Sequence, residues 1–140
     1  MSILDSILKN LPDEDDWLEK ALDQLDDLVG GLEDGTVKEG SEKIVDVLKN
    51  NKADIADLTR SSFVLFVSYV AADKTDDAVL TYLRKDATVD ELIAGMLRDA
   101  AAIVKAKERR EALKASALKL IKLITVEGAK KLLPLLLLAL

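Results

Sequence analysis

Residues 61–72 read Ser-Ser-Phe-Val-Leu-Phe-Val-Ser-Tyr-Val-Ala-Ala, the longest uncharged stretch near the middle of the chain. Its core, Phe63 to Val67, has strand propensity, but a helical pattern that Asn51 can cap precedes it, and no segment reads as a partner strand. A helix that is apolar on all sides is typical of a buried position. We therefore predict a buried central helix over about residues 53–72.

The composition around this stretch also favours helices. Gly, Pro and aromatic residues are scarce, Leu, Ala, Lys, Asp and Glu are abundant, and hydrophobic residues make up 49% of the chain. This apolar fraction is too high for a disordered protein, and 140 residues fit one domain. We predict an all-α fold, a single-domain bundle of five to seven helices over residues 1–140.

Upstream of the central helix, apolar stripes predict a short helix that ends near Pro12 and a second helix that Gly30-Gly31 closes. Four acids stand at the start of the second helix, where the helix dipole favours negative charge: Asp13, Glu14, Asp15 and Asp16. Residues 32–40 carry turn signals and are predicted as a loop, so the next helix is expected to open at Ser41 or Glu42.

Downstream, Thr88-Val89-Asp90-Glu91 forms a capping box and predicts the start of a long helix or helix pair over about residues 89–124. A pair is expected to bend near the charged stretch 105–111. In the second half, apolar residues share one face and lysines the other, as in an amphipathic helix. The inward side chains are expected to be Leu113, Ala117, Leu120, Ile121 and Ile124.

The chain ends in an apolar helix that Thr125 can cap and that Pro134 is expected to bend or restart. Lys130 and Lys131 come directly before the tail leucines, which are Leu132, Leu133, Leu135, Leu136, Leu137, Leu138 and Leu140. Because chain ends usually fray in water, so apolar an end is expected to dock. Its own core, a second subunit, a protein partner and a lipid surface remain alternatives.

Charge is distributed unevenly along the chain, whose formal net charge is −6. Residues 1–46 carry 4 Lys+Arg against 14 Asp+Glu, a balance of −10, whereas residues 100–140 carry 9 against 3, a balance of +6. The acidic part (1–50) and the apolar, basic part (89–140) of two copies could therefore attract one another. Head-to-tail contacts of this kind form rings or filaments.

Several chemistries are disfavoured by the residues present. Histidine and cysteine are absent, which removes the commonest general base, thiolate metal ligands and disulfides. Gly30 and Gly35 have phosphate-loop spacing, but Thr36 replaces the required lysine, and Asp73, Thr75 and Asp77 lack the glycine of an EF-hand loop. We predict no catalytic residues, no metal and no cofactor.

The function predicted from these features is that of a non-enzymatic structural or adaptor subunit. It would self-assemble or dock into a larger complex through the apolar C-terminal segment, with the tail leucines, Lys130, Lys131 and the four acids at 13–16 as interaction residues. The alternatives are a peripheral membrane protein with a basic amphipathic C-terminal helix and an acidic inhibitor that binds a basic partner.

Nucleic acid is disfavoured as a partner by the pI of about 4.7. The start of the chain lacks a secretory pattern, so a cytoplasmic location is expected.

Overall fold

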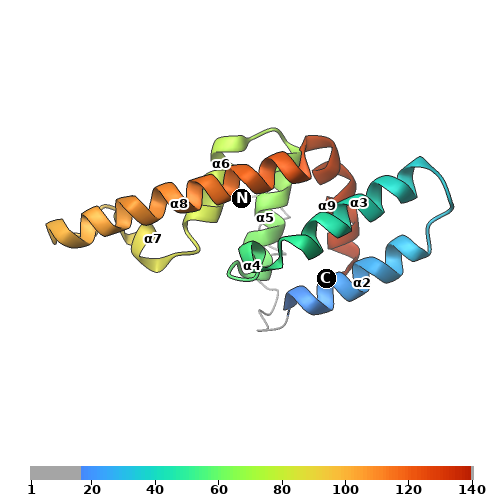
Figure 1. The fold of residues 1–140 in the computed structure, drawn as a ribbon, viewed down its shortest axis with the longest axis horizontal. Helices are drawn as coiled ribbons and strands as arrows, with labels where there is room; N and C mark the ends of the chain where they lie inside the picture. Colours follow the sequence, from blue (N-terminus) through green and yellow to red (C-terminus); the bar gives the residue numbers. More distant parts are fainter. Residues whose placement is uncertain (1–16, 140) are drawn as a thin grey trace.

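The computed structural model describes residues 17–139, in which every regular element is an α-helix (Figure 1). The prediction of an all-α fold is confirmed. The helices are α2 (Trp17–Gly30), α3 (Thr36–Asn50), α4 (Lys52–Ile55), α5 (Arg60–Ala71), α6 (Thr75–Leu83), α7 (Ala87–Ile93), α8 (Ala100–Ile124) and α9 (Val126–Ala139). The helix expected before Pro12, the acids at 13–16 and Leu140 lie outside the described residues.

The described helices exceed the expected five to seven because two segments are divided. The expected central helix over 53–72 consists of the short α4 and of α5, and the expected helix or pair over 89–124 consists of α7 and α8. Thr59 begins α5, since its side chain accepts a hydrogen bond from the N–H of Ser62 at 3.1 Å. The central helix therefore starts at Arg60 and not near residue 53.

Helix α5 occupies the centre of the molecule, as predicted, between α9 on one side and α6 on the other (Figure 1). Its sequence is apolar on nearly all sides because neighbours cover most of its surface. Five of its side chains are almost fully buried: Phe63, Val64, Phe66, Val67 and Val70. The ring of Phe66 lies 6.0 Å from that of Tyr82 on α6, which joins α6 to this core.

Helix α2 is attached to the core through Trp17. The Trp17 indole N–H donates to the carbonyl oxygen of Leu58 at 3.0 Å, and its ring lies 5.6 Å from the ring of Phe63. Leu18, Leu22 and the other apolar residues of one face are buried beside it. Helix α2 ends at Gly30, where the sequence predicts its end.

Helix α3 begins at Thr36, so the prediction of a loop over residues 32–40 is wrong for its last five positions. Gly35, with φ 149°, makes the turn before the helix, and Gly40 lies inside the helix. The intrinsic cost of a helical glycine is overridden here by the packing of α3 against α2 and α9. The Ser41 hydroxyl is buried and donates to the Val37 carbonyl oxygen at 2.8 Å.

The residues that start α7 and α8 differ from those expected. Asp86 caps α7 by accepting from the N–H groups of Thr88 and Val89, so Thr88 lies inside the helix. Asp99 caps α8 in the same way after a turn in which Gly95 has φ 72°. The chain thus breaks at 94–99 and not at 105–111, because a capping aspartate and a glycine coincide there.

Helix α7 and the first half of α8 form an arm that projects from the bundle (Figure 1). Ala106 and Val89 are buried between them. At the far end Met96 and Val104 are 66% and 56% exposed. The second half of α8 returns to the core, where the predicted inward face is confirmed: Ala117, Leu120 and Ile124 are buried, and Leu113 and Ile121 are half-buried.

Helix α9 starts after Thr125, whose hydroxyl oxygen accepts from the Gly128 N–H at 3.1 Å as the capping prediction requires. The helix continues through Pro134 to Ala139, so the expected restart at Pro134 is wrong. Pro134 and Lys130 both lie on the exposed side of α9. Water can therefore hydrogen-bond to the Lys130 carbonyl oxygen that the proline leaves without its helical donor.

Candidate functional site

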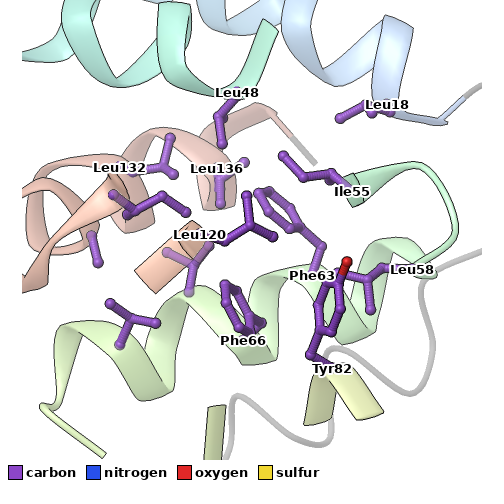
Figure 2. Packing of buried hydrophobic residues seen from close by; sticks show 14 of the residues in the cluster. Leu18, Leu48, Ile55, Leu58, Phe63, Phe66, Tyr82, Leu120, Leu132 and Leu136 are labelled. Atoms are coloured by element: carbon purple, nitrogen blue, oxygen red, sulfur yellow. The ribbon is translucent and has the colours of Figure 1, made fainter. Parts of the chain in front are cut away.

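The tail leucines divide into a buried and an exposed set. Leu132 and Leu136 are each only 1% exposed and point into the core beside Leu48, Ile55 and Phe63 (Figure 2). Leu133 and Leu135 are half-buried, whereas Leu137 and Leu138 are 43% and 72% exposed. The tail therefore docks within its own chain, and only its outer side is available to a partner.

The contact surface of α9 is formed by α5 foremost, then by α2 and α3, with a smaller contribution from α8. Gly128 lets α9 approach α3, because a Cβ there would collide with the Ile44 side chain. A pocket of about 300 Å³ opens next to this contact, lined by Glu39, Lys43 and Lys131 among others. Lys130 and Lys131 are both exposed, and Lys130 pairs with Glu127 of its own helix at 3.5 Å.

Helices α2 and α3 form a strongly acidic unit, called the acidic hairpin (residues 17–50). It contains nine acidic residues and four lysines, a balance of −5. All nine acidic side chains are exposed: Glu19, Asp23, Asp26, Asp27, Glu33, Asp34, Glu39, Glu42 and Asp46. Lys49 pairs with Asp26 at 2.8 Å, and the hydrogen bond from Lys49 to Asp26 raises the pKa of this lysine. Most of the acidic groups nevertheless face water.

Helix α8 carries the opposite charge. Residues 100–124 contain seven basic and two acidic side chains, a balance of +5. The term basic face of α8 covers the exposed basic side chains along this helix, which lie on more than one side of it: Lys105, Lys107, Arg109, Lys114, Lys119 and Lys122. Arg109 among them pairs with Asp86. Within residues 17–139, no ion pair connects this face with the acidic hairpin. The start of α8 and the α2–α3 connection lie at opposite ends of the longest axis (Figure 1).

A polar pocket of about 520 Å³ lies between α6, α7 and α8, lined by Lys85, Asp86 and Arg109 among others. The Lys85 ammonium, on a side chain only 9% exposed, donates to the Tyr82 hydroxyl at 3.0 Å and lies 4.2 Å from its ring centroid. The Tyr82 hydroxyl donates to the Asp54 carbonyl oxygen at 2.9 Å. These contacts join α6 to the end of α4. They leave only a small part of the Lys85 side chain accessible to a ligand.

Asp86 is the most constrained carboxylate of this pocket. Burial acts to raise the pKa of Asp86, but hydrogen bonds from the Val89 N–H, Arg109 and the Thr88 N–H, with the charge of Arg109, outweigh it. The pKa therefore lies below its ordinary value of 3.8. The Arg109 Nε donates to the Asp86 carboxylate at 2.6 Å. Asp86 is not among the residues predicted above, although aspartate before a helix is a known capping signal.

Replacing Asp86 tests its two roles separately. Asp86→Ala is expected to lower the free energy of unfolding by about 0.5–2 kcal/mol, because α7 loses its N-cap. Asp86→Asn keeps a capping oxygen and is expected to cost less. Because the folded-state pKa is depressed, the carboxylate stabilises the fold above the unfolded-state pKa, and this contribution is lost as the pH falls through the folded-state pKa. The stabilities of Asp86→Asn and the unchanged chain, measured by urea unfolding, should thus converge as the pH falls below the folded-state pKa of Asp86, and a constant difference would contradict the role of charge.

No three His, Cys, Asp or Glu side chains among residues 17–139 are grouped in a way that could hold a metal ion. The helices of the same range are each too short or too polar to cross a membrane.

The fold and the surfaces described above define the protein as an all-α domain with an acidic and a basic surface and an apolar C-terminal helix that is buried along one side. No protein-family model matches the chain, and neither curated proteins nor solved structures give a significant match.

Proposed function

We propose that the protein is a non-enzymatic structural subunit that assembles with further copies of itself. In this assembly, the acidic hairpin of one copy contacts the basic face of α8 of the next copy. The observation that supports the proposal is the matched pair of charge balances, −5 for the acidic hairpin and +5 for α8, with no ion pair between these two units within residues 17–139. Opposite potentials steer such surfaces together and fix their orientation.

The contact joins two different surfaces, so it is heterologous. Copies related by such a contact form a closed ring or an open filament, depending on the rotation between neighbours. The start of α8 and the α2–α3 connection lie at opposite ends of the longest axis, where one copy can hold a neighbour at each end (Figure 1). This geometry favours an assembly of more than two copies.

The outer side of α9 adds apolar area beside the acidic hairpin. Helix α9 packs against α2 and α3, and its exposed residues Leu137 and Leu138 lie at its C-terminal end. An interface commonly combines a fully buried apolar centre with a charged rim. We therefore assign these two leucines to the centre of the contact and the surrounding acids to its rim.

Light scattering of the full chain at low and high salt tests the proposal. We expect masses above that of a monomer at low salt and dissociation in about 1 M salt, where the Debye length falls to about 3 Å. A monomer at low salt would contradict the proposal. If that monomer also floated with anionic liposomes, the membrane-binding alternative would be supported instead.

Charge reversal on each face provides a sharper test. Asp23→Lys/Asp27→Lys changes the acidic hairpin, and Lys107→Glu/Lys114→Glu changes the basic face; all four side chains are exposed. We expect each double variant to be monomeric alone, because like charges then oppose each other, and an equal mixture to associate again. Lys74→Glu, on the exposed connection between α5 and α6, is the control and should associate like the unchanged chain. Failure of the mixture to associate would contradict the pairing of these two faces.

A further inference from the structure

The turn between α8 and α9 contains an unusual backbone conformation. Thr125 has φ 65° and ψ 162°. Glycine occupies this region, whereas a side chain branched at Cβ is strained in it. The Thr125 N–H donates to the Ile121 carbonyl oxygen at 2.9 Å, and the hydroxyl oxygen of Thr125 accepts from the Gly128 N–H. The turn is thus held in a strained form by local hydrogen bonds and by the docking of α9.

A helical conformation at Thr125 would release this strain and join α8 to α9. The N–H groups of residues 126–128 would then donate to the carbonyl groups of residues 122–124, which lie at the free end of α8. The joined helix would cover residues 100–139 and measure about 60 Å at 1.5 Å per residue. In this form α9 would be carried away from its own core.

The surface that α9 leaves is specific for α9. It is formed mainly by α5, α2 and α3, while α8 contributes least to the packing of α9. Leu132 and Leu136 fill it beside Leu48, Ile55 and Phe63 (Figure 2). Gly128 is also required for the close approach to Ile44 on α3. The α9 helix of another copy carries the same two leucines and the same glycine, so it fits this surface equally well.

We propose that two copies of the chain exchange α9, each inserting it into the α2–α3–α5 surface of the other. The inference deepens the proposed self-assembly and rests on it. A closed monomer and an exchanged dimer contain the same contacts of α9, so the conformation of Thr125 and the protein concentration decide between them. Strain in a short hinge is a known cause of such exchange.

Two substitutions at the hinge are expected to act in opposite directions. Thr125→Gly removes the strain of the closed turn and disfavours a continuous helix, so it should favour the monomer. Thr125→Ala removes the capping hydroxyl, leaves an unfavourable positive φ in the closed form and favours the helix, so it should favour the exchanged dimer.

Disulfide formation between copies can detect the exchange, because the chain has no cysteine of its own. The backbone of Gly40 on α3 faces the side chain of Lys131 on α9. One copy carries Gly40→Cys and the other Lys131→Cys; both are mixed, warmed to allow opening, cooled and oxidised. Only an exchanged dimer places these two cysteines side by side in different copies. Gly40→Cys mixed with Lys74→Cys controls for random collisions, and both cysteines in one chain report the closed form.

We expect the mixed disulfide to exceed the collision control in the otherwise unchanged chain. Thr125→Ala should increase its yield, and Thr125→Gly should lower it about tenfold, which corresponds to about 1.4 kcal/mol. Circular dichroism verifies that every variant is folded. Equal yields in all three hinge variants, or a yield no higher than the collision control, would overturn the exchange.

The result also separates this inference from the proposed function. If Thr125→Gly still associates at low salt but forms no mixed disulfide, the contact between charged faces stands and the exchange is wrong. If the mixed disulfide forms, while neither Lys107→Glu/Lys114→Glu nor high salt lowers the mass in solution, the exchange stands and the charged contact is wrong.

Discussion

A chain that ends at Lys131 is expected to lose cooperative folding. The deletion removes Leu132 and Leu136, whose side chains are each 1% exposed and pack into the core next to α5. Burial of one leucine side chain stabilises a fold by about 1.5–3 kcal/mol, and the cavity left behind adds to the loss. Together with the half-buried Leu133 and Leu135, the loss is comparable to the total stability of a domain, about 5–15 kcal/mol.

Single substitutions make the same point quantitatively. Leu136→Ala is expected to lower the free energy of unfolding by about 2–5 kcal/mol, measured by urea denaturation. Leu138→Ala, at a side chain that is 72% exposed, is the matched control and should change it by less than about 0.5 kcal/mol. Cooperative melting of the truncated chain at the unchanged temperature would show that α9 does not contribute to the core.

Gly128→Val is expected to give the second large loss of stability. A Cβ at this position would overlap the Cδ1 atom of Ile44 and lie 3.3 Å from its Cγ1 atom and from the Thr125 hydroxyl oxygen. Overpacking of this kind typically costs about 1–3 kcal/mol. Thermal and urea unfolding would measure the change. Gly40→Ala is a suitable control, because its Cβ would meet only the flexible end of Lys131.

A double substitution identifies the cause of this loss. If the valine at 128 acts by pushing against Ile44, then adding Ile44→Ala should make the combined cost smaller than the sum of the two single costs. Simple additivity would mean that Gly128→Val disturbs α9 by itself and that the approach of α9 to α3 is not the reason.

The parts of the fold that could be predicted from the sequence are those fixed by local signals or by a clear apolar stripe. The inward face of α8 from Leu113 to Ile124, the end of α2 at Gly30 and the capping role of Thr125 all follow from periodicity, glycine or a hydroxyl group. Gly40 and Pro134 misled the prediction, because contacts with α9 and solvent exposure offset their local preferences. Such compensation depends on neighbours that are distant in sequence.

The orientation of the tail could not be predicted for a similar reason. Its leucines cover all sides of a helix, so no stripe marks the inward face. Leu132 and Leu136 follow Gly128 by four and eight residues and so share its side of α9, the side that approaches Ile44, whereas Leu137 and Leu138 do not. The opposite charges of the two ends of the chain, in contrast, could be predicted from the sequence, because counting charges does not require knowing which side of a helix each residue lies on.

The chain contains a single tryptophan, and that residue joins α2 to the core. The Trp17 indole contacts the Leu58 carbonyl group and the Phe63 ring. Its fluorescence therefore reports whether α2 is packed against the core. Far-ultraviolet circular dichroism reports all helices together. Comparison of the two signals during unfolding therefore distinguishes a bundle that opens at its acidic end from one that comes apart as a whole.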